Sequence, residues 1–122
     1  MYENLKKKFG QNFLIDNNIL NKITNLIDNE KLEILEIGPG DGRLTDNILK
    51  KNPKNLDLIE IDKELFSNLI NKYSNNKNVN IENDDILNFK INKQYDLIIS
   101  NLPYNVSSQV LVQLSTIKKK PK

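Results

Sequence analysis

The tetrad Asn101-Leu102-Pro103-Tyr104 combines side chains that suit chemistry on a nucleobase amine. The exocyclic amine of adenine is a poor nucleophile because its lone pair is delocalised into the ring. The Asn101 side-chain oxygen and a backbone carbonyl beside Pro103, whose fixed φ helps to hold the loop, can accept the amino hydrogens. Tyr104 offers an aromatic face for a base that has left its stack. These roles predict N-methylation of adenine, and the alternative is a proline-bearing turn without a ligand.

Three glycines form a second candidate binding element. Gly38, Gly40 and Gly42 directly follow an apolar run at residues 33–37 and precede a predicted helix. Glycines at such a turn let the backbone bend sharply and approach a ligand, so we expect Gly38 and Gly40 to contact one. A strand-to-helix turn without a ligand is the alternative. The dinucleotide fingerprint G-x-G-x-x-G requires a longer step before its last glycine, which disfavours a nicotinamide cofactor.

Two acidic positions point to an adenosine-containing ligand. Glu60 lies about 20 residues after the glycines, at the end of a predicted strand, where a carboxylate can accept hydrogen bonds from both ribose hydroxyls. Asp85 follows the next short strand and is placed to accept a hydrogen bond from the adenine amino group. Asp84 can take that role instead, or both aspartates can simply cap the turn.

Alternating elements position these residues. Apolar residues at helical spacing predict helices at residues 19–27, with Asp16 as N-cap, and at 44–49, 65–73 and 107–117. Short apolar runs predict strands at residues 33–37, 56–61, 79–82 and 96–100. This alternation predicts one α/β domain with a doubly wound parallel sheet of about four strands, which binds its ligand at the carboxyl edge.

Composition excludes several function classes. The 122 residues contain no cysteine and no histidine, so thiolate or histidine catalysis and the usual zinc ligands are excluded, and we expect no metal. No apolar run approaches the roughly 18 residues that span a bilayer, and the N-terminus does not resemble a secretory signal, so we expect a cytoplasmic protein. The net charge is +2, with lysine clusters at residues 6–8 and 118–122. These clusters are phosphate contacts or solvated tails.

With these residues identified, the sequence closely resembles the ribosomal RNA adenine N6-dimethyltransferase family. The resemblance runs through KKKFGQNFL, EIGPGDGRLT, LIEID, NDDILNF and SNLPYNVSS, which together cover nearly the whole chain. FGQNFL followed by EIGPG resembles the small-subunit enzymes more than the macrolide-resistance enzymes. The resemblance implies a Rossmann-like class I methyltransferase fold and two successive methyl transfers from S-adenosyl-L-methionine to N6 of adenosines in small-subunit ribosomal RNA.

The resemblance also implies site residues that spacing alone does not assign. It implies that S-adenosylmethionine is contacted by Asn12, Leu14, Gly38, Glu60, Asp85 and Asn101. It implies that Asn101 and Tyr104 serve the target adenine, beside Pro103. Residues 1–15 would then be a basic segment that carries the cofactor-contacting QNFL, and residues 16–122 a partial methyltransferase domain.

Length is the departure from the family. Its members continue through three more strands and a helical C-terminal domain that helps to hold RNA. Without those strands, we expect the strand at residues 96–100 to present an unpaired apolar edge, unless a complementing chain covers it. The short length makes a non-catalytic RNA-binding remnant one alternative. The motifs leave three others, which are a large-subunit RNA methyltransferase, a nicotinamide oxidoreductase and a DNA adenine methyltransferase.

Overall fold

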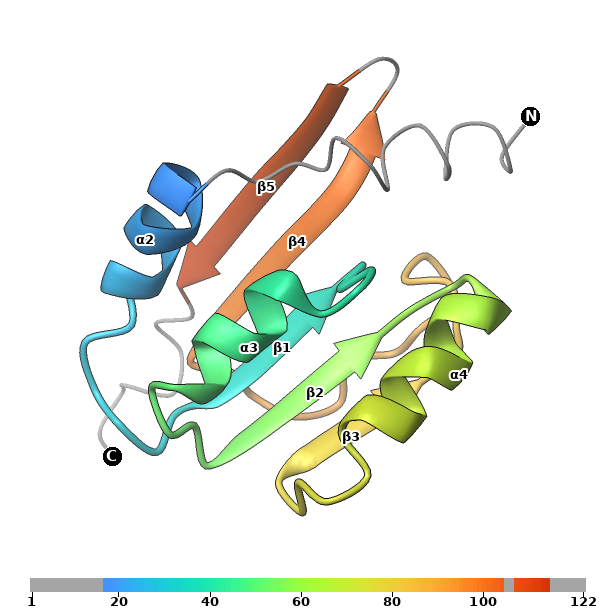
Figure 1. Cartoon of the computed structure of the whole chain (residues 1–122), viewed down its shortest axis with the longest axis horizontal. Helices are drawn as coiled ribbons and strands as arrows, with labels where there is room; N and C mark the ends of the chain where they lie inside the picture. The colour runs from blue at the N-terminus through green and yellow to red at the C-terminus, as the bar shows by residue number, and fades with distance from the viewer. Residues whose placement is uncertain (1–16, 105–106, 115–122) are drawn as a thin grey trace.

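The computed structural model describes residues 17–104 and 107–114. Figure 1 shows how the elements of this part of the chain alternate between helix and strand up to β3. In chain order the elements are α2 (Asn17–Asn25), β1 (Glu33–Ile37), α3 (Arg43–Leu49), β2 (Asn55–Ile59), α4 (Lys63–Lys72), β3 (Val79–Glu82), β4 (Leu97–Tyr104) and β5 (Ser107–Leu114). The strands predicted at residues 33–37 and 79–82 have the predicted bounds.

The strands form one sheet in the order β3-β2-β1-β4-β5. Neighbouring strands from β3 to β4 are parallel, and β5 is antiparallel to β4. The chain progresses outward from β1 through β2 to β3 and then crosses back to the other side of β1 with β4. This reversal confirms the predicted doubly wound parallel architecture and places its switch point between β1 and β4.

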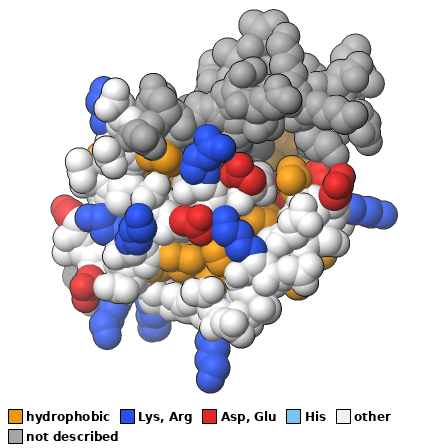
Figure 2. All heavy atoms as spheres, in the orientation of Figure 1, with side chains coloured by type: hydrophobic (Ala, Val, Ile, Leu, Met, Phe, Trp, Pro, Cys, Tyr) orange, Lys and Arg blue, Asp and Glu red, His pale blue; other side chains and the backbone are white. Residues whose placement is uncertain are grey.

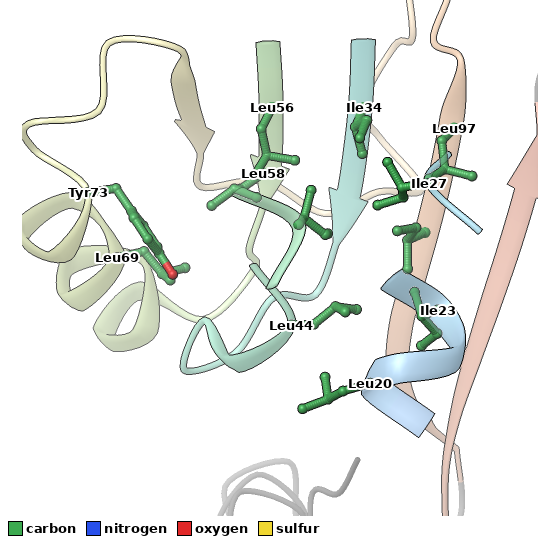
Figure 3. Close-up of a cluster of buried hydrophobic side chains, with 12 residues drawn as sticks. Leu20, Ile23, Ile27, Ile34, Leu44, Leu56, Leu58, Leu69, Tyr73 and Leu97 are labelled. Atoms are coloured by element: carbon green, nitrogen blue, oxygen red, sulfur yellow. The ribbon is translucent and has the colours of Figure 1, made fainter. Parts of the chain in front are cut away.

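Apolar side chains of the strands pack on both faces of the sheet, as expected for parallel strands that are covered on two sides. On one face, side chains from α2, α3 and α4 pack against the strands, as Figure 3 shows for the labelled members Leu20, Leu44 and Leu69. On the other face, Leu35, Ile37, Ile59 and Tyr95 form a second cluster, against which the segment between β3 and β4 packs. The strand ends that carry the glycines and Glu60 are therefore fixed by burial on two sides.

The helix predicted at residues 107–117 is wrong over the residues that the structure describes. Residues 107–114 form β5, paired with β4 from Leu97↔Leu114 to Tyr104↔Ser107. A bare β4 edge would leave backbone donors and acceptors without partners, and β5 satisfies them while its Val-Leu-Val run favours extended backbone. The expectation that β4 presents an unpaired edge is corrected by the same pairing.

The Asn101–Tyr104 tetrad is also part of β4, where the sequence predicted a loop after the strand. β1 pairs with β4 only as far as Ile37↔Ser100, so the tetrad extends past the end of β1 and pairs with β5 alone. Pro103 is tolerated there because it lacks a neighbouring parallel strand that would need its missing N–H.

The charge distribution, the helices and the acidic side chains of the described residues bear on three kinds of function. Figure 2 shows basic and acidic side chains interspersed on the face that carries the helices. None of the helices at residues 17–72 is both long enough and apolar enough to cross a membrane. The described residues also contain no cluster of acidic side chains that could hold a metal ion.

Candidate functional site

The strand register brings the predicted site residues to one edge of the sheet. Ile37 pairs with Ile59 of β2 and with Ser100 of β4, so Gly38 follows at the level of Glu60 on one side and Asn101 on the other. A backbone hydrogen bond from Gly38 N to Ile59 O, 2.9 Å long, ties the start of the glycine loop to β2. The backbones of Gly38, Glu60 and Asn101 therefore lie together at the carboxyl edge of the sheet, as the sequence predicted.

The glycine loop (residues 38–42) needs glycine for its backbone geometry. Gly38 has φ 73° and Gly40 has φ 64°, in the left-handed region that side-chain-bearing residues rarely adopt. Gly42, with φ 91°, is the N-cap residue of α3. Gly38 and Gly40 are half-buried and Gly42 is buried, and the absence of side chains at these positions lets neighbouring groups approach the backbone closely.

Glu60 is buried at the carboxyl end of β2, with 4% of its surface exposed. Its Oε1 accepts a hydrogen bond from Gly40 N at 3.0 Å, and its Oε2 accepts one from Asp62 N at 3.1 Å. Burial raises the pKa of Glu60, and the N–H bonds from Asp62 and Gly40 lower it in part. Glu60 thus fixes the glycine loop while its carboxylate retains further acceptor positions, since two oxygens carry about four lone-pair sites.

Asp84 and Asp85 lie after β3, where they make turn hydrogen bonds. Asp84 Oδ1 accepts from Asp85 N at 2.7 Å, and Asp85 Oδ1 accepts from Leu87 N at 3.0 Å. These contacts match the alternative in which both aspartates cap the turn, and the role of Asp85 toward an adenine stays a prediction.

Sequence reasoning missed Asn83, which braces the same strand end. Its Nδ2 donates to Glu60 O at 2.9 Å and to Ile61 O at 3.2 Å. The backbone after β2 is therefore held from β3 as well as from the glycine loop. An asparagine directly after a strand was the available signal, but it does not reveal which carbonyls the side chain reaches.

Glu36 was also missed, although a charged residue inside the apolar run EILEI was a visible signal. It is fully buried, and its Oε1 accepts a 2.6 Å hydrogen bond from Thr45 Oγ1 of α3. Its Oε2 has no hydrogen-bond partner among the described residues. Desolvation by burial raises the pKa of Glu36 to about 8, and the Thr45 bond partly opposes that rise. Glu36 is therefore largely protonated at neutral pH, two residues before Gly38.

Several predicted residues fall where the structure describes nothing or only backbone. Asn12 and Leu14 lie outside the described residues, as do Asp16 and both lysine clusters. For Asn101, Pro103 and Tyr104 the strand position is described and the side chains are not. Their predicted contacts with cofactor and adenine stay predictions.

Comparisons with known proteins agree with this geometry. A model of the ribosomal RNA adenine dimethylase family matches residues 2–122. The ribosomal RNA small subunit methyltransferase A of Pelagibacter ubique is 45% identical over 114 residues, which cover 91% of this chain and 43% of that protein. The protein of the same name from Mycoplasma mobile is 45% identical over 115 residues, covering 93% of this chain and 44% of that protein.

Solved structures show the same relationship. The 23S rRNA methyltransferase ErmE superposes with a TM-score of 0.66 at 28% identity, covering 78% of this chain and 39% of that one. A dimethyladenosine transferase from Plasmodium falciparum superposes with a TM-score of 0.63 at 29% identity, covering 75% and 34%. The chain spans less than half the length of the curated relatives that it matches. The family predicted from the motifs is confirmed, and this chain belongs to the ribosomal RNA adenine dimethylases.

Proposed function

We propose that this chain is the cofactor-binding part of an S-adenosylmethionine-dependent methyltransferase that dimethylates N6 of adenosines in small-subunit ribosomal RNA. The strand register carries the proposal, because it sets Gly38 level with Glu60, directly after β2, and with Asn101 of β4. Asn12 and Leu14 would complete the cofactor site from residues 1–15. Relatives named for the small subunit, at 45% identity, favour that RNA over the large-subunit RNA named for ErmE, at 28% identity.

The described residues fit an adenosine-containing methyl donor. Glu60 is a carboxylate held at the sheet edge, which suits a pair of ribose hydroxyls because it only accepts hydrogen bonds when ionised. Gly38 and Gly40, at positive φ, leave the backbone open to a close approach. The glycine spacing disfavours a nicotinamide dinucleotide.

The chemistry that this chain contributes is binding and orientation. When bound, S-adenosylmethionine supplies an activated methyl group. The Asn101 side chain and a carbonyl beside Pro103 would accept the N6 hydrogens, which draws the amine lone pair out of conjugation and toward the methyl carbon. Tyr104 would hold the base by stacking. The N6 proton leaves after transfer, from a more acidic methylated amine, so the chain needs no histidine as general base.

The partner in this proposal is ribosomal RNA in the cytoplasm, met through phosphate contacts of the lysine clusters. A second chain that completes the sheet is not required to cover β4, since β5 already pairs with it. The competing proposal is a non-catalytic RNA-binding remnant, in which the glycine loop and Glu60 persist without ligand.

Calorimetric titration of the 122-residue chain with S-adenosylmethionine, and with NADH as the control ligand, tests the proposal. We expect saturable binding of the methyl donor alone. Glu60→Ala should weaken that binding by about 1 to 3 kcal/mol, because a charge-assisted acceptor pair is lost. Glu82→Ala is the matched control, because it removes an exposed carboxylate at the end of β3, one strand away. Equal affinities for the parent and Glu60→Ala would reject Glu60 as the ribose ligand.

Methyl transfer separates the enzyme from the remnant. The chain is incubated with small-subunit RNA and methyl-labelled S-adenosylmethionine, and label in N6-dimethyladenosine is measured. We expect Asn101→Ala to abolish transfer while circular dichroism stays native-like. Transfer unchanged in Asn101→Ala would refute the proposed mechanism. A folded parent that neither binds S-adenosylmethionine nor transfers its methyl group would favour the remnant.

A further inference from the structure

Two side chains at the end of α4 contact the glycine loop from the outside, and the Asp46 carboxylate of α3 holds both of them. Tyr73, at the end of α4, places its hydroxyl 2.6 Å from Asp46 Oδ1 and 3.1 Å from Gly42 O. Lys72 Nζ donates to Asp41 O at 3.1 Å and to Asp46 Oδ2 at 3.0 Å. We call Asp46, Lys72 and Tyr73 the loop clamp. It joins α4 to the loop and to the first turn of α3 across about thirty positions of sequence.

The clamp is tightly packed against the loop. A Cβ atom built at Gly42 would lie 2.5 Å from the Tyr73 hydroxyl oxygen and 3.0 Å from Lys72 Nζ. Tyr73 is 5% exposed, and the Lys72 ammonium lies 5.4 Å from the centre of its ring. Burial, followed by the hydrogen bond to Asp46, raises the pKa of Tyr73, so the phenol keeps its proton for donation at neutral pH. Figure 3 shows Tyr73 pointing from the end of α4 toward the interior.

The other side of the loop is held by β2. Gly38 N bonds to Ile59 O, and Gly40 N bonds to Glu60 Oε1. Along the rest of the loop, Asp41 O accepts a hydrogen bond from Lys72 Nζ, and Gly42 O lies 3.1 Å from the Tyr73 hydroxyl oxygen, whose single hydrogen Asp46 and Gly42 share. A loop held in its binding shape before the ligand arrives loses less conformational entropy on binding, which strengthens the affinity.

We propose that Tyr73, with Lys72, is a positioning residue that holds the glycine loop in the shape that binds the methyl donor. The proposal rests on the proposed function for its ligand. Its direct consequence is independent of that ligand: the backbone amides of Gly38 and residues 40–42 should exchange their hydrogens more slowly while the Tyr73 hydroxyl holds the loop.

The chain contains a matched control for the clamp. Tyr95, also 5% exposed, places its hydroxyl 2.6 Å from Asp57 Oδ2, and Lys93 Nζ lies 5.2 Å from its ring centre. Lys93 also pairs with Asp57 and with Glu33, the first residue of β1. Tyr95, Lys93 and Asp57 repeat the chemistry of the clamp beside the start of β1 and the middle of β2, away from the glycine loop.

The experiment compares Tyr73→Phe with Tyr95→Phe in the 122-residue chain. Both substitutions remove one hydroxyl bonded to a carboxylate and keep the ring, so we expect similar reductions of the urea midpoint. In Tyr73→Phe, the dissociation constant for S-adenosylmethionine should rise about fivefold to tenfold, the equivalent of one lost hydrogen bond. In Tyr95→Phe it should change less than twofold. Amide exchange at Gly38 and at residues 40–42 should accelerate in Tyr73→Phe alone.

Lys72→Met and Lys93→Met provide a second pair of variants on half-exposed side chains, where loss of folding is not expected. Lys72→Met should move affinity and loop exchange in the same direction as Tyr73→Phe. Equal affinity and equal loop exchange in the two phenylalanine variants would overturn the proposal. A parent that binds no S-adenosylmethionine, but whose loop exchange accelerates in Tyr73→Phe alone, would support the clamp and refute the proposed function.

Discussion

Replacing Glu36 by Gln should stabilise this protein at alkaline pH and leave its stability nearly unchanged at acidic pH. Glu36 is fully buried, it receives one hydrogen bond from Thr45, and its second oxygen has no partner among the described residues. Gln keeps an oxygen for the Thr45 hydroxyl and places an uncharged donor where the protonated acid would carry its O–H. The substitution therefore removes the ionisation and preserves the shape of the neutral form.

The magnitude follows from the pKa of Glu36, which burial raises from 4.5 to about 8. Because the folded state holds the proton more tightly, the stabilising contribution is complete below pH 4.5 and is lost as the pH rises through 8. Each pH unit between these values costs about 1.4 kcal/mol, so the complete loss is at most about 5 kcal/mol. Local rearrangement around an ionised Glu36 reduces this cost. We expect Glu36→Gln to gain about 2 to 5 kcal/mol over the parent at pH 8.5.

Urea denaturation at pH 5, 7 and 8.5, followed by circular dichroism, measures this effect. The difference in the free energy of unfolding between variant and parent should be smallest at pH 5 and grow steadily to pH 8.5. Burial also raises the pKa of Glu60, which is present in both proteins, so the difference contains only the coulombic effect by which Glu60 helps to raise the pKa of Glu36. A difference that stays constant over this range would show that Glu36 titrates near its ordinary pKa, and the argument from burial would be refuted.

Two further substitutions test the packing around the glycine loop. Gly42→Ala should destabilise the fold by about 1 to 3 kcal/mol, because φ is 91° and the new methyl group meets the Tyr73 hydroxyl. Urea denaturation should give a smaller free-energy cost of Gly42→Ala in a Tyr73→Phe background. Equal costs in the two backgrounds would disprove the contact. Thr45→Val should cost about 1 to 3 kcal/mol by leaving Glu36 without its donor, and should raise the pKa of Glu36 further. A cost that persists unchanged in a Glu36→Leu background, which offers Thr45 no acceptor, would contradict that assignment.

The order of the elements and the identity of the family could be read from the sequence. Each short apolar run is followed within a few residues by glycine or an acidic residue, which marks where the strand ends. The bounds of β1 and β3 were therefore predicted as observed, and Glu60 was predicted at the end of β2. These signals are local, because apolar periodicity and turn-forming residues report on the conformation of only a few neighbouring residues.

Only the tertiary structure decided that residues 107–114 form a strand. The spacing of its apolar residues predicted a helix, but the segment lies beside the open edge of β4 and pairs with it. A short apolar segment with β-branched residues fits either a helix or a strand, and the available hydrogen-bond partners determine the choice.

Long-range contacts of individual side chains also depended on the fold. The sequence marked Tyr73 as one apolar position of a helix, and this was confirmed by its burial. Nothing in the local pattern indicated that its hydroxyl reaches Gly42 and Asp46. The pattern also did not indicate that Glu36 would be buried with Thr45 as its hydrogen-bond donor. The sequence by itself determined which residues could form the candidate site. Tertiary structure decided which of them brace one another, because burial and hydrogen-bond partners are set by the crossover of the chain around β1.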